Sequence, residues 1–368
     1  MELEGDGQRV SQAAWASDGS SVIQVARDQH VHLGDGVGER VRTFGPVSGE
    51  CPYPGLAAFE AEQADWFFGR DAVVADLISL MDRRSREGGI QVVIAPSGAG
   101  KSSLLRAGLV PSLAQAALPG SDRWRVVVCT PTAEPEVDPG DGEGRVVLVV
   151  DQFEELFTLC ADEDRRKAYV DRLAELAADP AQALVVLGVR ADFHAACADH
   201  PPLRAALQDA PLVVGPMGRA ELRETIVMPA RLAGLDIETG LVDLLLTDLG
   251  ATSGYEAGRL PLLAHALRVC WQQRNGSTLT VQGYRDSGGI QHALATTADA
   301  TFASLDEDGQ RLARTAFLRL VRIGDGTDDT RRRVPLRELP AAVVDAFTRA
   351  RLLTSDRDTV EITHEALL

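Results

Sequence analysis

Lysine is nearly absent from this chain of 368 residues. Only Lys101 and Lys167 occur, and arginine supplies the rest of the 37 basic residues. The two side chains are not interchangeable, because lysine carries a compact point charge and arginine a wide planar fork. A sequence that avoids lysine but keeps one directly after Ala99-Gly100 therefore indicates a task at Lys101 that a compact ammonium performs better than a guanidinium.

A net positive charge is also lacking. The chain has 54 acidic residues against 37 basic ones, which gives a formal net charge of −17. This balance argues against a broad nucleic-acid or anionic-membrane surface, although a local patch could still bind one. Hydrophobic residues make up 45% and charged residues 25%, which is ordinary for a folded protein. The length favours two or three domains over a single core.

Cysteine pairs and long apolar runs are missing as well. The five cysteines are widely spaced and form no C-x-x-C pair, so neither a zinc site nor a disulfide framework is indicated. They are typical of small hydrophobic residues in a reducing compartment. No apolar run approaches the roughly 18 residues of a membrane span, and the acidic N-terminus has no signal-peptide core. We therefore expect a cytoplasmic protein without a membrane partner.

The central motif is the stretch VVIAPSGAGKSS, residues 92–103. It combines an apolar run short enough for a buried strand, a loop of small residues, and Gly-Lys-Ser opening a helix expected over 104–109. Backbone N–H groups of such a loop cradle phosphate, aided by the positive end of the helix. Ala95 stands where the strict pattern has glycine. We predict a nucleotide site formed by Ser97, Gly98, Ala99, Gly100, Lys101, Ser102 and Ser103, with Ser102 also on Mg²⁺.

A carboxylate ends another apolar strand, expected over 145–150. Asp151 would lie at the carboxyl edge of a parallel sheet, where ligands bind, and is a candidate to hold Mg²⁺ through water. Glu154 or Glu155 would orient or deprotonate an attacking water. The alternative is that Asp151 caps the next helix and that the two glutamates occupy its favourable first turn.

Two further groups have open alternatives. Arg190 ends the apolar run 183–190 and could contact the γ-phosphate, or it could form a surface salt bridge with Asp192. Phe68-Gly69-Arg70 precedes a helix expected over 72–81, where backbone and apolar side chains could sandwich a base. The alternative there is a hydrophobic staple at the start of the helix.

The order of apolar patterns predicts the fold. Continuously apolar strands alternate with helices, which is typical of a parallel sheet covered on both faces. The strands are expected before the phosphate loop and over 124–129, 145–150, 183–190 and 212–215, and one of the helices over 161–179. Helical periodicity follows over 219–233, 241–249 and 260–273, with Pro261 in a first turn. Helices over 310–321 and 336–351 and a hairpin of 352–354 with 360–362 form a winged-helix pattern.

We therefore predict an α/β fold: a parallel-sheet P-loop NTPase core followed by a helical lid domain and a winged-helix domain. The expected boundaries are 1–50 for a flexible linker or small β region, 51–215 for the core, 216–303 for the lid, and 304–368 for a winged-helix domain truncated at its C-terminus. Winged helices often bind DNA, and Arg331-Arg332-Arg333 would suit it. Next to Asp328 and Asp329 these arginines instead favour a solvated loop.

From about Cys51 to Leu368 the chain resembles the bacterial novel STAND NTPases, relatives of the NACHT and NB-ARC switch ATPases. The motifs that carry the resemblance, as they stand in this sequence, are CPYPGLAAFEAEQADWFFGRD, APSGAGKSSLLRAGLVPSL, VVLVVDQFEELFTLC, LVVLGVRADF, VGPMGRAEL, GRLPLLAHAL, TLTVQGYRDSGGI and VEITHEALL. Together they are far more specific than the phosphate loop alone.

The resemblance implies particular roles. Phe68, Gly69 and Arg70 would contact adenine, and Asp151 with Glu154 and Glu155 would form the extended acidic motif. Arg190 would be the sensor arginine. The remaining two implied residues are Pro261, packing near the base from the lid, and His364, contacting the β-phosphate of ADP and holding the closed, inactive state.

Three departures from the family pattern qualify these roles. Relatives carry a longer, largely helical insertion between residues 130 and 145, where this chain has a short acidic loop. Gln152 follows Asp151 at a position that is acidic in many ATPases, so we expect slow turnover. The chain also ends inside the helix expected after His364, which indicates a trimmed or minimal form.

These features lead to one hypothesis with two rivals. The hypothesis is a weak Mg²⁺-dependent ATPase that acts as an ATP/ADP switch, self-associates when activated, and works with effector and sensor parts absent from this chain. ATP is favoured over GTP because no Asn-Lys-x-Asp motif occurs. The rivals are a nucleotide-bound scaffold without hydrolysis and a winged-helix DNA-binding ATPase, which the net charge opposes.

Overall fold

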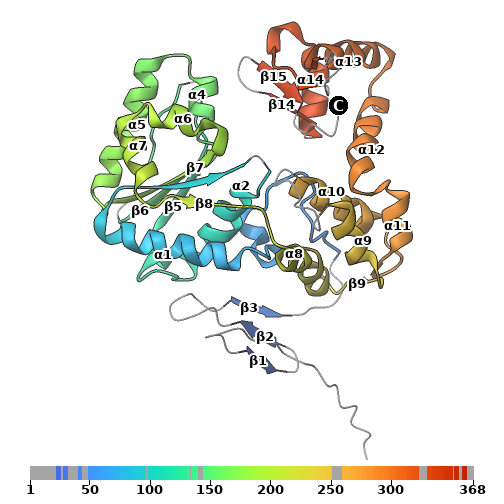
Figure 1. The fold of residues 1–368 in the computed structure, drawn as a ribbon, viewed down its shortest axis with the longest axis horizontal. Helices are drawn as coiled ribbons and strands as arrows, with labels where there is room; N and C mark the ends of the chain where they lie inside the picture. The colour runs from blue at the N-terminus through green and yellow to red at the C-terminus, as the bar shows by residue number, and fades with distance from the viewer. Residues whose placement is uncertain are drawn as a thin grey trace, which may run out of the picture.

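The structure is a computed structural model that describes residues 22–25, 28–31, 40–43, 49–96, 98–132, 134–139, 144–250, 259–322, 330–350, 352–355 and 359–362. An α/β core, a group of helices beside it and a C-terminal unit with helices and strands are visible in Figure 1. The predicted fold class, a parallel-sheet core followed by helical and winged-helix parts, is confirmed. None of the helices in the described ranges is both long and apolar enough to cross a membrane.

The core is built on five parallel strands in the order β5-β6-β7-β4-β8. Their bounds are β4 Ile90–Ala95, β5 Arg125–Cys129, β6 Val146–Val150, β7 Ala183–Arg190 and β8 Leu212–Val213. Every residue of β4 and β6 is buried, as the apolar runs 92–95 and 146–150 predicted, and the buried residues of β4 include the polar Gln91. Within the described part of residues 130–145, between β5 and β6, there is no helix.

Helices cover both faces of the sheet (Figure 1). Alternate strand residues point to opposite faces, so Val93 and Val147 pack in one apolar cluster and Val92 and Leu148 in the other. The first cluster includes residues of α1 (Asp71–Glu87) and of the helix that follows the phosphate loop. The second includes residues of α5 (Glu163–Ala178), α6 (His194–Ala198) and α7 (Pro201–Gln208).

The helix after the phosphate loop is longer than predicted and has an unusual centre. It begins at Lys101 and runs through α2 (Lys101–Ser103), the segment η2 (Leu104–Leu109) and α3 (Val110–Ala114). Segment η2 has the wider π-helical bonding pattern. Such segments are rare and are frequent at functional sites.

The lid is helical, as predicted. It contains α8 (Arg219–Leu232), α9 (Leu241–Asp248), α10 (Leu260–Gln272), α11 (Val281–Asp286) and α12 (Gly289–Ala303), with short strands β9 (Asp236–Ile237) and β10 (Thr278–Leu279) paired in parallel. Pro229 lies inside α8 without ending it. Helices α11 and α12 were not predicted.

The C-terminal part combines helices with a small antiparallel sheet. Helix α13 (Glu307–Leu320) begins earlier than predicted because the Asp306 side chain caps it, accepting from the Gly309 N–H at 2.8 Å. The helix predicted over 336–351 is instead a turn, η6 (Leu336–Glu338), and a separate α14 (Ala341–Arg349), divided at Pro340. Strands β13 (Val334–Pro335), β14 (Leu353–Ser355) and β15 (Thr359–Ile362) pair in the order β13-β15-β14.

Two regions bear on the predicted domain boundaries. Strands β1 (Val22–Val25), β2 (Asp28–Val31) and β3 (Arg40–Thr43) form a small antiparallel sheet where a flexible linker or small β region was expected. One continuous apolar cluster contains Leu222 of the lid, Phe347 of the C-terminal part and also Tyr53. The tyrosine hydroxyl donates to the Ile226 carbonyl in α8 at 2.7 Å, so residues near 53 pack on the lid. The boundaries themselves stay predictions.

Candidate nucleotide-binding site

The phosphate loop joins the buried strand β4 to the helix that begins at Lys101. Gly98 and Gly100 have φ angles of 72° and 87°, the left-handed region that favours glycine. Ala99 between them is buried, and Ser97 lies outside the described residues. The loop therefore delivers the chain to the N-terminus of a long helix, where the helix dipole and free N–H groups favour an anion.

The ammonium of Lys101 is buried and contacts Gly188 in β7 and Asp151 directly after β6. It donates to the Gly188 carbonyl at 3.0 Å and to Asp151 Oδ1 at 3.4 Å, and lies 3.8 Å from Glu154 Oε2. The absence of a side chain at Gly188 permits this approach, because a Cβ there would stand 3.3 Å from the ammonium. The arrangement gathers one cation and two carboxylates at the carboxyl ends of β6 and β7.

Asp151 is fully buried and accepts several hydrogen bonds. Its Oδ1 accepts from Ser102 Oγ at 3.1 Å and from the Gln152 N–H at 2.9 Å, in addition to Lys101. Asp151 does not cap the next helix, because α4 (Glu155–Leu159) has Glu154 at its N-cap position and no side-chain cap. The capping half of that alternative is therefore wrong, whereas Glu155 does lie in the first turn of α4.

The donor set suits a hard cation. Ser102 Oγ and Asp151 Oδ1 are both oxygen donors and already lie within hydrogen-bond distance of each other. The described residues contain no group of three or more His, Cys, Asp or Glu side chains able to hold a metal. A cation here would need further oxygens, which fits Mg²⁺, an ion usually held by one or two carboxylates together with substrate phosphates and water.

Glu154 is buried beside this pair. Its Oε2 accepts from the Arg190 backbone N–H at 3.2 Å. Burial raises the pKa of the Glu154 carboxyl above its usual value, against the lowering effect of the Lys101 charge. A carboxylate with a raised pKa is a better general base near neutral pH. Glu155, the other candidate, is the first residue of α4 and is half-buried.

The Arg190 side chain is engaged with Asp192. Its Nε donates to Asp192 Oδ1 at 3.2 Å and its Nη2 to Oδ2 at 2.5 Å, while the guanidinium carbon lies 5.6 Å from the centre of the Phe193 ring. The salt bridge considered as an alternative is thus present. A contact with the γ-phosphate stays a prediction and would require this pair to open.

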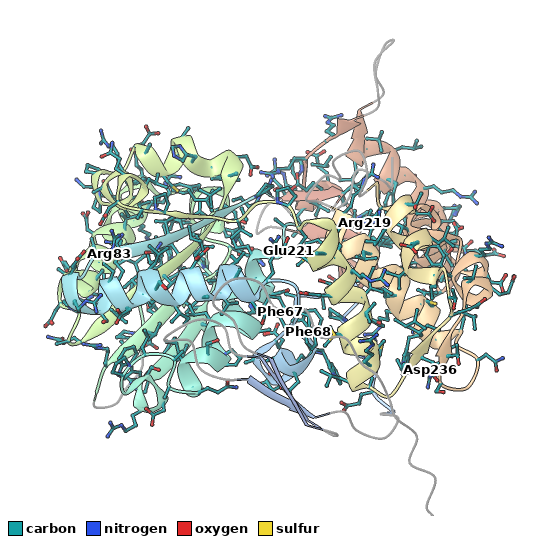
Figure 2. All side chains as sticks on the ribbon, turned by 60° about the horizontal axis from the view of Figure 1, so that its bottom comes forward. Phe67, Phe68, Arg83, Arg219, Glu221 and Asp236 are labelled. Atoms are coloured by element: carbon teal, nitrogen blue, oxygen red, sulfur yellow. The ribbon has the colours of Figure 1, made fainter. Side chains whose placement is uncertain are left out.

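The segment Phe68-Gly69-Arg70 lies between the phosphate loop and the lid. A Cβ on Gly69 would stand 2.5 Å from the Glu221 carbonyl oxygen of α8, and Thr225 Oγ1 donates to the Phe68 carbonyl at 3.2 Å. Figure 2 shows Phe68 at the boundary of core and lid, near Glu221. A hydrophobic staple in the strict position is absent, because the residue before the N-cap Arg70 is glycine, but Phe67 belongs to the same apolar cluster as Val74 in the first turns of α1.

Arg70 is buried and joins two backbone segments. Its Nη2 donates to the Ala99 carbonyl in the phosphate loop at 3.2 Å and to the Gly215 carbonyl, just after β8, at 2.7 Å. The guanidinium thus holds the phosphate loop to the strand that leads into the lid. An adenine contact by this segment stays a prediction.

The lid meets the phosphate loop at the start of α10. The Leu260 Cδ1 atom would lie 3.9 Å from a Cβ on Gly100, and Pro261 is the next residue of the helix. This proximity fits the role predicted for Pro261, which no observation tests. His364 lies outside the described residues, so its predicted contact with ADP stays a prediction.

Two contacts at the helix after the phosphate loop were not predicted, one made by Arg106 with Asp151 and Glu60 and one made by Ser103 with Phe59. Arg106 donates from Nε to Asp151 Oδ2 at 3.3 Å and from Nη1 to Glu60 Oε1 at 2.8 Å. Ser103, predicted only as part of the loop, accepts the Phe59 N–H on its Oγ at 3.0 Å. A sequence signal existed for Arg106, because it follows Ser102 by four residues and so shares its helix face.

The site is that of a P-loop NTPase: a strand leads through a glycine-rich loop into a helix, and Lys101 and Ser102 at the start of this helix contact Asp151. The family model described as Novel STAND NTPase 1 matches residues 52–141 and 136–368. The chain therefore belongs to the novel STAND NTPase 1 family, in agreement with the resemblance found in the sequence.

Solved structures with a similar arrangement are distant in sequence. The Aeropyrum pernix ORC1 protein in complex with DNA is 15% identical over 82% of this chain and 91% of its own, with a TM-score of 0.48. A point mutant of Thermotoga maritima RuvB is 14% identical over 86% and 97%, with a TM-score of 0.40. No curated protein matches the chain. At this level of similarity the solved structures carry no information on function.

Proposed function

We propose that this chain is a nucleotide-dependent molecular switch. It binds ATP or ADP with Mg²⁺, hydrolyses ATP slowly, and changes its self-association in signalling or defence. The observation that carries the proposal is that the phosphate loop and the helix that it opens are connected both to the acidic groups and to the segment that leads into the lid. Lys101 contacts Asp151 on one side, while Ala99, through Arg70, is tied to Gly215 at the entrance to the lid.

Each residue of the site has a definite task in this proposal. The loop N–H groups and Lys101 bind the phosphates, and Lys101 exchanges its contact with Asp151 for phosphate oxygens. Ser102 and Asp151 hold Mg²⁺, which when bound neutralises phosphate charge. Glu154 orients the attacking water and takes its proton, and Arg190 senses the γ-phosphate after leaving Asp192.

The switch requires different affinities in two arrangements of the lid, because a ligand shifts such an equilibrium only by its differential affinity. Phe68, Gly69 and Pro261 would contact the base where the lid meets the loop, and His364 would hold the ADP-bound closed form. Exchange of ADP for ATP would then expose a surface for self-association. Effector and sensor parts would be supplied by other segments or proteins. The five free thiols support a cytoplasmic location.

The first experiment identifies the nucleotide that purified protein retains, by denaturing the protein and analysing the supernatant by mass spectrometry. We expect bound ADP in the wild type and at least about tenfold less in Lys101→Ala. Lys167→Ala is the matched control, because this only other lysine is exposed on α5. Equal occupancy in the two variants, or none in the wild type even after incubation with ATP, would contradict the proposal.

A scaffold that binds nucleotide without hydrolysis is the second candidate. The Arg190–Asp192 pair favours it, because the guanidinium is engaged away from any phosphate. Single-turnover hydrolysis separates the two candidates. A switch that hydrolyses ATP should lose turnover by about 100-fold in Glu154→Gln while keeping its nucleotide affinity. A scaffold should give the same background rate for both proteins.

A further inference from the structure

One arginine lies between two carboxylates at the edge of the site. Arg106 Nε donates to Asp151 Oδ2 at 3.3 Å, and Arg106 Nη1 donates to Glu60 Oε1 at 2.8 Å and Oε2 at 3.1 Å. The Asp151 side chain is completely buried, that of Arg106 is 25% exposed and that of Glu60 is 52% exposed. The guanidinium therefore links a buried acid to a solvent-facing one.

The buried acid is compensated by two cations. Lys101 lies 3.4 Å from Oδ1 of Asp151 and Arg106 lies 3.3 Å from Oδ2. An ionised carboxylate without water needs such partners, because its uncompensated burial is costly. A divalent cation bound at Asp151 would be repelled by both charges at these distances. Lys101 can turn to phosphate oxygens, whereas Arg106 already touches a second acceptor in Glu60.

We propose that Arg106 serves as the counter-ion of Asp151 in the metal-free site and competes there with Mg²⁺, and that Glu60 draws it away when Mg²⁺ binds. This inference rests on the proposed function, since it assumes that Asp151 holds the Mg²⁺ of a nucleotide. Arg106 is a positioning residue in this scheme, because it acts through Asp151. The Arg106–Glu60 pair then sets how strongly nucleotide binding depends on the metal.

The pair also connects the metal site to the lid. Glu60 is the N-cap residue of η1 (Ala61–Trp66), the turn that leads into Phe67 and Phe68. Its neighbour Phe59 donates its N–H to Ser103 in the helix after the phosphate loop. Directly after Phe68, Gly69 packs against the Glu221 carbonyl of α8. A shift of Arg106 from Asp151 towards Glu60 would therefore act on the segment that carries the contact between core and lid.

The test measures the dissociation constants of ADP and of a non-hydrolysable ATP analogue in excess EDTA and in excess Mg²⁺. For each nucleotide, the dissociation constant in EDTA divided by the dissociation constant in Mg²⁺ gives a ratio that reports the contribution of the metal. This ratio cancels the general attraction of phosphate to positive charge. Arg106→Gln should raise the ratio by about threefold to tenfold, because the competitor is gone. Glu60→Gln should lower it by about twofold to threefold, because Arg106 then stays on Asp151.

The opposite signs distinguish this scheme from a structural role, in which both substitutions would weaken binding together. In the double variant Arg106→Gln/Glu60→Gln, the effect of Glu60→Gln on the ratio should disappear, because the Arg106 guanidinium on which Glu60 acts is absent. Arg106→Lys, which keeps the charge, should lie close to the wild type. Glu60→Gln changes a half-exposed side chain and is informative even if Arg106→Gln fails to fold.

Two negative outcomes are separable. In the first, the wild type binds nucleotide and Lys101→Ala does not, but the ratios of Arg106→Gln and Glu60→Gln change in the same direction or stay at the wild-type value. The role of Arg106 is then overturned and the proposed function stands. If folded wild type binds neither nucleotide in either buffer, both are overturned.

Discussion

The Lys101 ammonium lies 3.4 Å from Asp151 Oδ1 although the strands that precede these residues are not neighbours. Strand β7 separates β4 from β6, and the ammonium crosses over it at Gly188, whose carbonyl it contacts at 3.0 Å. A side chain at residue 188 would interfere with this crossing. The closeness of the loop and the carboxylate thus depends on one glycine in the middle strand.

Gly188→Ala should therefore damage the site. The added Cβ would stand 2.7 Å from Leu105 Cδ1 and 3.3 Å from both Asp151 Oδ1 and the Lys101 ammonium. We expect a loss of about 1–3 kcal/mol in the free energy of unfolding, typical of overpacking, and weaker nucleotide binding. Chemical denaturation and a binding titration measure the two effects. Gly49→Ala is the control, since no atom lies within 4 Å of its Cβ position, and unchanged stability in Gly188→Ala would refute the crossing as described.

Glu154 should make stability depend on pH. Burial raises the pKa of this carboxyl in the folded protein above its ordinary value of 4.5. The folded state therefore disfavours the ionised form, so the contribution of Glu154 to stability is full below pH 4.5 and is lost as pH rises through the folded pKa. As the pH rises from about 4.5 towards neutrality, the free energy of unfolding of Glu154→Gln should therefore increase relative to that of the wild type.

The measurement for Glu154 is the difference in free energy of unfolding between the two proteins at several pH values. The direction of the pKa shift already includes the attraction of Lys101. A difference that moves in favour of the wild type as the pH rises would show that the carboxylate is stabilised by its surroundings. In the same pH range the hydrolysis rate of the wild type should increase with pH, because a general base must be ionised.

Arg70 offers a test between two roles. As the donor to the Ala99 and Gly215 carbonyls it holds the loop to the entrance of the lid. Arg70→Ala would leave the buried Ala99 carbonyl and the part-buried Gly215 carbonyl without this donor, at a cost of about 1–3 kcal/mol in stability, and faster amide exchange is expected near residue 215. Arg70→Lys should recover part of the loss.

The comparison of ATP with inorganic tripolyphosphate decides between these roles. If Arg70 acts by holding the loop, its removal weakens both ligands by the same factor, because both use the loop. If Arg70 contacts adenine, as the family resemblance implied, only ATP loses affinity. A changed ratio of the two dissociation constants would therefore contradict the role inferred from its hydrogen bonds.

The core strands and the proximity of Ser102 to Asp151 could be predicted because each has a local signal. Residues 146–150 and 183–189 carry no polar side chain, and the position of Asp151 after the first of them follows from the strand pattern. The contact between Ser102 and Asp151 followed from the motif, since both residues would have to reach one metal. Here local sequence and tertiary structure agree.

The contacts that were missed depend on packing between distant segments. Arg106 meets Glu60 across 46 residues, and Arg70 meets Gly215 across 145, and neither pairing has a motif of its own. The break at Pro340 had a local signal that the apolar pattern of 336–351 obscured, since proline has no N–H to continue a helix. Side-chain partners of arginine are thus the least predictable part of this site.

The Arg190–Asp192 pair should restrain the response to the γ-phosphate. Asp192 holds both Nε and Nη2 of Arg190, so a phosphate must compete with a bidentate carboxylate for the same donors. Asp192→Asn removes the charge but keeps the shape, and should tighten binding of a non-hydrolysable ATP analogue relative to ADP by about threefold to tenfold. Arg190→Gln should abolish that preference, and in its background Asp192→Asn should have no effect. If Asp192→Asn leaves the ratio of ATP-analogue affinity to ADP affinity unchanged, Arg190 does not reach the γ-phosphate. The contribution of Arg190 to the site would then be the hydrogen bond from its backbone N–H to Glu154.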